Sequence, residues 1–168
     1  MEMDKHGQLL EEFDGLARSS SGVRPLMQRI SERLHEEMTR YNWVGFYFIE
    51  SPNRNALVLG PYEGSFMPTQ RIPLDKGLCG AAARSKKSVV VNNVSADPRY
   101  LGSDMVKSNM VVPIIVKNQV EAELCIESYF TDTFDQAEKQ FVESCTAVVA
   151  RFMHKESSAA TAGKTQTS

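Results

Sequence analysis

The fold is decided by two stretches of the chain, Asn42-Trp43-Val44-Gly45-Phe46-Tyr47 and, further along, Gly77-Leu78-Cys79-Gly80. The first opens a run over residues 43–49 that is rich in aromatic and β-branched side chains. Turn-forming residues at 51–55 follow, and this pattern predicts a strand that ends in a tight turn. Residues 56–60 are expected to continue as its antiparallel partner. A loop and a short strand then lead to a cysteine that lies between two glycines.

The composition is that of a globular protein with one domain. The chain has 168 residues, of which 42% are hydrophobic and 24% charged, and its formal net charge is -2. This length suits one continuous core. Because nucleic-acid and membrane-surface binding usually require basic patches, we expect neither as a partner. No apolar run reaches the length of a transmembrane helix and no signal-like segment follows the first residues, so we expect a cytoplasmic protein.

The chain contains three cysteines, Cys79, Cys125 and Cys145. They form neither a CxxC pair nor a zinc-type spacing, so we expect no metal site and no cofactor. An odd number of cysteines in a cytoplasmic chain is typical of free thiols. Two interpretations of Cys79 stay open. Its thiolate is stabilised by the N-terminus of a short helix at 80–85, or it is a small residue where the backbone turns tightly.

Helices are predicted at both ends of the chain, over residues 4–18, 24–40 and 135–155. Ser21 is the expected N-cap of the second helix. That helix carries an apolar stripe at i+4 spacing. The stripe consists of Leu26, Ile30, Leu34 and Met38, and the corresponding stripe of the last helix consists of Phe141, Cys145, Val149 and Phe152.

The middle of the chain is strand-like. Residues 88–92 predict a strand buried on both faces, because three valines follow one another, and residues 108–117 and 119–128 predict a hairpin. Helices at both ends of an antiparallel sheet give an α+β fold, with the terminal helices on one sheet face and pocket-forming loops on the other. The predicted divisions are an N-terminal helix and linker at 1–22, one domain at 23–155 and a disordered tail at 156–168.

The strand predicted at 119–128 alternates between two kinds of side chain. The side expected to face the core carries Val120, Ala122, Leu124 and Ile126. The opposite side carries Glu121, Glu123, Cys125 and Glu127. If this opposite side faces a loop-covered cavity, Glu127 is the best candidate there for a ligand contact. Glu121 and Glu123 are expected to be solvated.

The order of these motifs resembles that of a GAF domain and, within that superfamily, of the free methionine-(R)-sulfoxide reductases. The similarity runs from about residue 26 to residue 153. Its motifs are Asn42-Trp43-Val44-Gly45-Phe46-Tyr47, Leu59-Gly60-Pro61, Arg71-Ile72-Pro73, Gly77-Leu78-Cys79-Gly80, Val111-Val112-Pro113-Ile114 and Leu124-Cys125-Ile126-Glu127-Ser128. The resemblance implies a GAF fold with a small-molecule pocket beneath its loops.

The resemblance also implies a thiol chemistry whose residues are largely replaced here. A thiolate attacks the sulfoxide sulfur, and a second thiol then closes a disulfide that an external dithiol reduces. The position implied for the attacking cysteine holds Ser103, and a position implied for a resolving cysteine holds Thr69. Only Cys79 of the family's cysteines is present. A serine hydroxyl has no sulfenic acid or disulfide chemistry, so the resemblance argues for the fold and against the reaction.

The carboxylates that the resemblance implies around a substrate ammonium group are replaced in part. Their positions hold Asn109, Cys125 and Glu127, so one carboxylate of three is retained. The aromatic residues of the first strand are the expected apolar lining of the pocket. The expected ligand-binding residues are therefore Trp43, Tyr47, Ser103, Asn109, Cys125 and Glu127.

Three functions are consistent with these patterns. The first is a small-molecule-binding GAF domain with a regulatory or signalling role, a catalytically degenerate relative of the reductases, whose ligand the sequence does not name. The second is an active or altered reductase that uses Cys79. The third is a ligand-free dimerisation or partner-docking module, with a homodimer formed through the apolar stripes of the terminal helices.

Overall fold

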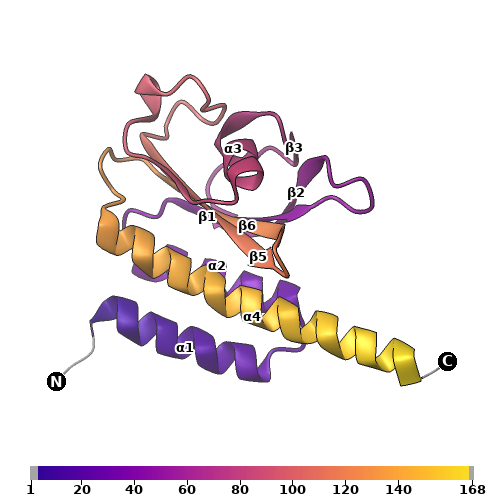
Figure 1. Cartoon of the computed structure of the whole chain (residues 1–168). Helices are drawn as coiled ribbons and strands as arrows, with labels where there is room; N and C mark the ends of the chain where they lie inside the picture. The colour runs from indigo at the N-terminus through magenta and orange to yellow at the C-terminus, as the bar shows by residue number, and fades with distance from the viewer. Residues whose placement is uncertain (1–3, 167–168) are drawn as a thin grey trace.

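A six-stranded antiparallel sheet forms the centre of the molecule, whose computed structural model describes residues 4–166 (Figure 1). The elements, in chain order, are α1 (Lys5–Ser19), α2 (Val23–Glu37), β1 (Trp43–Ile49), β2 (Ala56–Gly64), β3 (Arg71–Pro73), α3 (Gly77–Ser85), β4 (Val89–Val91), the short 3-10 helix η1 (Val94–Ala96), β5 (Ser108–Val116), β6 (Gln119–Ser128) and α4 (Gln136–Gln166). The strand order is β3-β2-β1-β6-β5-β4, which places β1 and β6 at the centre. The predicted α+β architecture is confirmed.

The two faces of the sheet have different coverings (Figure 1). Helices α2 and α4 lie on one face, with α1 packed against them on the side away from the sheet, and α3 with the long loops lies on the other face. The core on the helix side is built mainly from apolar side chains, because α2 and α4 turn their stripes toward the sheet. This core includes Leu26, Ile30, Leu34, Val44, Phe46, Leu124, Ile126, Phe141, Cys145 and Val149. The predicted homodimer stripes are thus mostly buried within one chain, and the homodimer itself stays a prediction.

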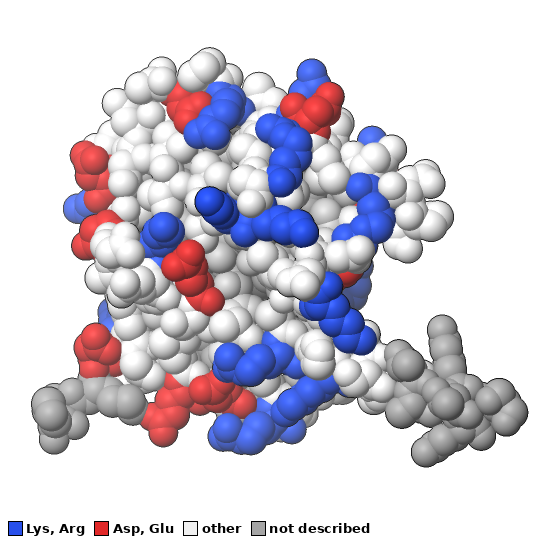
Figure 2. Space-filling view, viewed as in Figure 1, with Lys and Arg blue, Asp and Glu red and all other residues white. Residues whose placement is uncertain are grey.

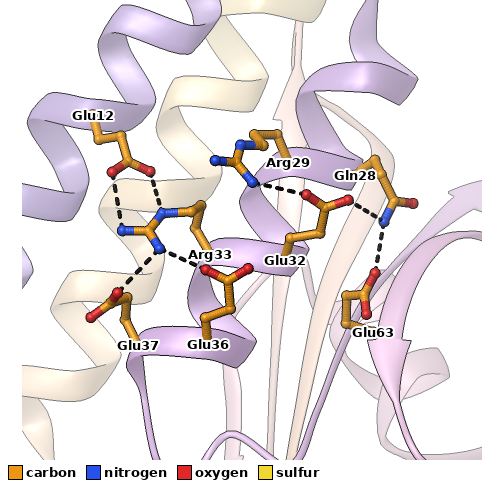
Figure 3. A network of polar contacts seen from close by, with 8 residues as sticks. All are labelled: Glu12, Gln28, Arg29, Glu32, Arg33, Glu36, Glu37 and Glu63. Atoms are coloured by element: carbon orange, nitrogen blue, oxygen red, sulfur yellow. Dashed lines mark hydrogen bonds and ion pairs between the residues drawn. The ribbon is translucent and has the colours of Figure 1, made fainter.

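A network of ion pairs attaches α1 to α2 (Figure 3). The Arg33 guanidinium donates to Glu12 of α1 through two nitrogens, at 2.7 and 3.2 Å, and also to two glutamates of its own helix. In the same view, Gln28 of α2 donates to Glu63 of β2 at 2.9 Å. Exposed ion pairs contribute little stability individually. The two-nitrogen contact with Glu12 does, however, fix the orientation of α1 on α2.

The ends of α2 differ from the prediction. The helix begins after Gly22, which occupies the N-cap position without a side-chain hydrogen bond, so the assignment of Ser21 as the cap was wrong. It is Ser20 whose hydroxyl binds this turn, donating to the Gly22 carbonyl at 2.8 Å. The helix ends at Glu37, because Met38 is already extended and directs the chain toward the buried Tyr41 and the start of β1.

The C-terminal segment continues the last helix. Helix α4 is described to Gln166, and residues 167–168 lie outside the described part. Continuing an existing helix needs no new nucleus, and alanine is the strongest helix former. The disordered tail expected at 156–168 stays a prediction.

Strand β4 is more exposed than predicted. Its three valines are half-buried, so the expectation of a strand buried on both faces was wrong. The reason is its place at the edge of the sheet, where it pairs with β5 alone. Val90 contacts the helix-side core, and Val89 and Val91 contact the opposite one, but the free edge leaves all three partly open.

Acidic and basic side chains are interspersed on the face of the molecule that Figure 2 shows. Within residues 4–166, none of the helices combines the length and the apolar character that crossing a bilayer requires. The same residues contain no cluster of His, Cys, Asp and Glu side chains that could hold a metal ion.

Candidate functional site

A cavity of about 400 Å³ lies on the sheet face that α3 and the loops cover. Residues of β1, β5, β6 and α3 line it, together with the segments around residues 66–69 and 100–103. Its volume suits a small organic molecule. The structure brings all six sequence-predicted site residues to this one cavity, namely Trp43, Tyr47, Ser103, Asn109, Cys125 and Glu127. Their contact with a ligand stays a prediction.

Trp43 forms the aromatic wall of the cavity. Its indole stacks on the rings of Tyr62 and Phe66, with centroids 5.5 and 5.9 Å away. The indole also requires glycine at two neighbouring positions, because a Cβ at Gly45 or at Gly64 would overlap the ring. Gly64 is available for this contact because β2 continues beyond the predicted end at residue 60. Trp43 is 1% exposed, and its indole N–H has no hydrogen-bond partner among the described residues.

Tyr47 connects the floor to the wall of the cavity. Its hydroxyl donates a hydrogen bond to the Thr69 carbonyl at 2.9 Å, which ties the loop before β3 to β1. Burial raises the pKa of Tyr47 well above its ordinary value, so the hydroxyl stays protonated and remains a donor. Thr69 itself is exposed at the rim. The bond explains why this loop is held closely enough to enclose the cavity.

Glu127 is the carboxylate of the cavity. It lies near the end of β6 opposite Trp43 of β1 and Asn109 of β5. The Tyr100 hydroxyl lies 3.2 Å from its Oε1. Burial raises the pKa of Glu127 from its ordinary 4.5 to about 7, and the hydrogen bond from Tyr100 opposes that rise. Near neutral pH, this carboxyl therefore exchanges a proton readily, which suits either cation binding or proton donation.

The thiols of Cys79 and Cys125 meet on the cavity floor. Asn109, 2% exposed, donates through Nδ2 to the Ile126 carbonyl at 2.9 Å and to Cys125 Sγ at 3.5 Å. A hydrogen bond from the Cys79 thiol to Cys125, together with burial, raises the pKa of Cys79 well above its ordinary value. A raised pKa favours the thiol over the thiolate that the N-terminus of α3 was expected to stabilise. Its buried environment supports the alternative of a packed small residue, with a thiol partner that the sequence analysis missed.

Glu123 is fully buried, contrary to the expectation that it is solvated. It follows the alternation of β6 and so shares the face of Cys125, between β1 and β5. Neither carboxyl oxygen has a hydrogen-bond partner among the described residues, and burial raises its pKa well above the ordinary value. Only Glu121 is solvated as expected, and it pairs with Arg54 at 3.2 Å. The period-two pattern alone placed Glu123 on the cavity face, but sequence could not show that the sheet and α3 cover it.

The rim of the cavity is shaped by Ser103, whose hydroxyl accepts a hydrogen bond from the Met105 amide at 3.2 Å. The sequence analysis did not predict the cavity residues Tyr100 and Phe66, because irregular loops carry no periodic signal.

Cys145 lies on the other side of the sheet, fully buried in the helix-side core as predicted.

This architecture, an antiparallel sheet with terminal helices on one face and a loop-covered cavity on the other, has known relatives. The profile of the GAF domain family matches residues 23–152. The chain belongs to the GAF domain family.

Within the GAF family, the chain is similar to free methionine sulfoxide reductases. It is 31% identical over 163 residues to "Free methionine-R-sulfoxide reductase" of Escherichia coli (strain K12), which covers 94% of this chain and 96% of that protein. To the protein of the same name from Saccharomyces cerevisiae it is 34% identical over 110 residues, 64% of this chain and 61% of the relative. The structure of fRMsr of Staphylococcus aureus in its reduced form has a TM-score of 0.81 and 27% identity, covering 89% of this chain and 96% of that one. The resemblance inferred from the motifs is confirmed.

Proposed function

We propose that this GAF domain binds a free amino acid of the methionine sulfoxide type in the cavity between β1, β6 and the loops. The observation that carries the proposal is Glu127, a half-buried carboxyl group that lies beside Trp43 in the lining of a cavity of about 400 Å³. A carboxylate in such a place favours an ammonium group, and charge-assisted hydrogen bonds of this kind are the stronger ones. The relatives named as reductases of free methionine sulfoxide support the same ligand class.

The unpartnered indole N–H of Trp43 supports the proposal independently. A buried donor without an acceptor is costly, and a polar ligand atom in the cavity relieves that cost. A sulfoxide oxygen is a strong acceptor, and the methyl and methylene groups of the same ligand suit the rings of Trp43, Tyr47 and Phe66. An amino acid with an oxidised thioether thus offers a partner for each kind of surface in the cavity.

Two uses of such binding are distinguished by the thiols. Ser103 and Thr69 stand where the resemblance implies cysteines, which favours a regulatory or signalling role in which the ligand is bound and not consumed. Cys79 and Cys125 face one another on the cavity floor, which favours the second use, reduction of the ligand. The binding step is common to both.

The binding proposal is tested by isothermal titration calorimetry of the full chain with free L-methionine-(R)-sulfoxide at pH 8. We expect saturable binding that weakens about 10- to 100-fold in Glu127→Gln, because a charge-assisted hydrogen bond is worth about 1.5–3 kcal/mol. Glu121→Gln is the matched control, because Glu121 lies on the same strand outside the cavity. Binding that is absent, or equally strong in Glu127→Gln, would contradict the proposal.

A further inference from the structure

We propose that Cys79 and Cys125 form a redox-active dithiol, which reduces a small sulfoxide held in the cavity. This inference rests on the proposed function, because the sulfoxide ligand proposed there is the oxidant of the dithiol. The dithiol joins a thiol of α3 to a thiol of β6, and both line the cavity. It differs from the cysteine set that the resemblance implies, because Cys125 stands at a position implied to hold a carboxylate.

The surroundings of the two sulfur atoms assign them different roles. Cys125 Sγ accepts from Asn109 Nδ2 at 3.5 Å, and the Cys79 thiol is directed at the same sulfur. Cys125 Sγ thus accepts hydrogen bonds, whereas the Cys79 thiol donates one, and a sulfur attacks through the lone pairs with which it accepts. Cys125 is therefore the attacking sulfur. Cys79, which keeps its proton until it is needed, is the resolving one.

The proton that the reaction requires comes from the Cys79 thiol. A sulfoxide oxygen leaves as water, and its departure needs a proton donor near the sulfur under attack. Cys79 holds its proton beside Cys125 and fulfils that role. Glu127 lies two residues after Cys125 on β6, so both side chains point to the cavity, and its carboxylate holds the ammonium group of the same ligand. The Tyr100 hydroxyl beside Glu127 keeps the carboxyl oriented.

The reaction balances without a further oxidant. The dithiol loses two electrons and two protons, and an S–S bond forms between Cys125 and Cys79. The sulfoxide sulfur gains the two electrons and becomes a thioether, its S–O bond breaks, and the oxygen departs as water with the two protons. For a second cycle, an external dithiol such as dithiothreitol is oxidised to its own disulfide and returns both cysteines to thiols.

The test is a single-turnover experiment on the reduced full chain, freed of reductant under anaerobic conditions and mixed with excess free methionine-(R)-sulfoxide. We expect about one methionine per chain, the mass loss of two hydrogen atoms, and a Cys79–Cys125 crosslink by peptide mapping. Cys79→Ala and Cys125→Ala should each abolish the methionine and the crosslink. Cys145→Ala is the matched control and should retain both, because Cys145 lies in the opposite core. Circular dichroism confirms that each variant is folded.

Failure of this inference is distinguishable from failure of the proposed function. If calorimetry shows sulfoxide binding but neither methionine nor the crosslink forms, the dithiol mechanism is overturned and the binding proposal stands. A parallel arm with hydrogen peroxide tests the thiol pair without the sulfoxide. A crosslink in that arm, in a chain that does not bind the sulfoxide, supports the dithiol and overturns the ligand class. No crosslink with either oxidant overturns the dithiol itself.

Discussion

The two faces of strand β6 are built from alternate residues and have opposite character. The helix-facing residues Ala122, Leu124 and Ile126 are apolar and fully buried. The residues of the opposite face, Glu123, Cys125 and Glu127, are polar or reactive; the last two line the cavity, and the two glutamates have raised pKa values. Both sets share the same backbone and the same hydrogen-bond ladders with β1 and β5. The alternation therefore separates an apolar face that packs against the helices from a polar face on the side of the cavity.

The difference shows that apolar burial on one face of a sheet can offset the cost of burying polar groups on the other face. A buried unpartnered carboxyl such as Glu123 opposes folding. The apolar core on the helix side offsets that cost, since it buries a continuous set of large side chains. The substitutions below compare the two faces, and the expected changes in the free energy of unfolding decrease from one to the next.

The largest effect is expected on the helix face. Leu124→Ala removes a fully buried side chain at the centre of the sheet and should lower the free energy of unfolding by about 3–4 kcal/mol. Cys125→Ala, its neighbour on the cavity face, should lower it by less than about 1 kcal/mol. Urea denaturation measures both. Similar losses in the two variants would contradict the division between the faces.

The next effect is the pH dependence that Glu127 imposes. The folded chain holds this proton to a pH of about 7, whereas the unfolded chain releases it near the ordinary 4.5. The proton therefore favours folding below about pH 4.5, and stability falls as pH rises from there through 7, by about 2–3 kcal/mol. Denaturation at several pH values should show a shallower fall in Glu127→Gln. Glu121→Gln should retain the slope of the wild type, and a loss of slope there would contradict the assignment.

A smaller effect of opposite sign is expected at Glu123. Replacing this buried carboxyl by leucine removes two unpartnered oxygens from a dry site, so Glu123→Leu should raise the free energy of unfolding by about 1–2 kcal/mol. Thermal denaturation at pH 8, where the cost of burial is greatest, measures the gain. The same change at the exposed Glu121 should have little effect. Destabilisation by Glu123→Leu would indicate that the carboxyl has a structural role.

The smallest effect is expected at the end of α4. The residues that follow Ser157 directly, Ser158, Ala159 and Ala160, are exposed and belong to neither core. Removing residues 158–168 should change the free energy of unfolding by less than about 0.5 kcal/mol. Ser157 is kept, because its hydroxyl contacts Lys117 Nζ at 3.1 Å. A loss above 1 kcal/mol on chemical denaturation, by the scale of surface substitutions, would show that the end of the helix supports the domain.

Local sequence patterns predicted the strands and turns that depend on residues close together in the sequence. The strand at Trp43–Ile49 and the hairpin of β5 and β6 follow from side-chain periodicity, and their bounds agree with the structure. The six cavity residues followed in part from the same alternation and in part from the resemblance. The burial of Glu123 and the meeting of Cys79 with Cys125 were missed, because both depend on how α3 packs over a distant strand. Contacts of this kind have no local signature.

Trp43 is the chain's single tryptophan, and it stands in the wall of the cavity. Indole emission depends on the polarity and the quenching groups around the ring, and all the indole fluorescence of this protein originates from one known place. Every photon excited at the red edge of aromatic absorption therefore reports on the site and not on an average over the molecule. The geometry that makes Gly45 and Gly64 necessary also gives the native, unlabelled protein an intrinsic optical probe.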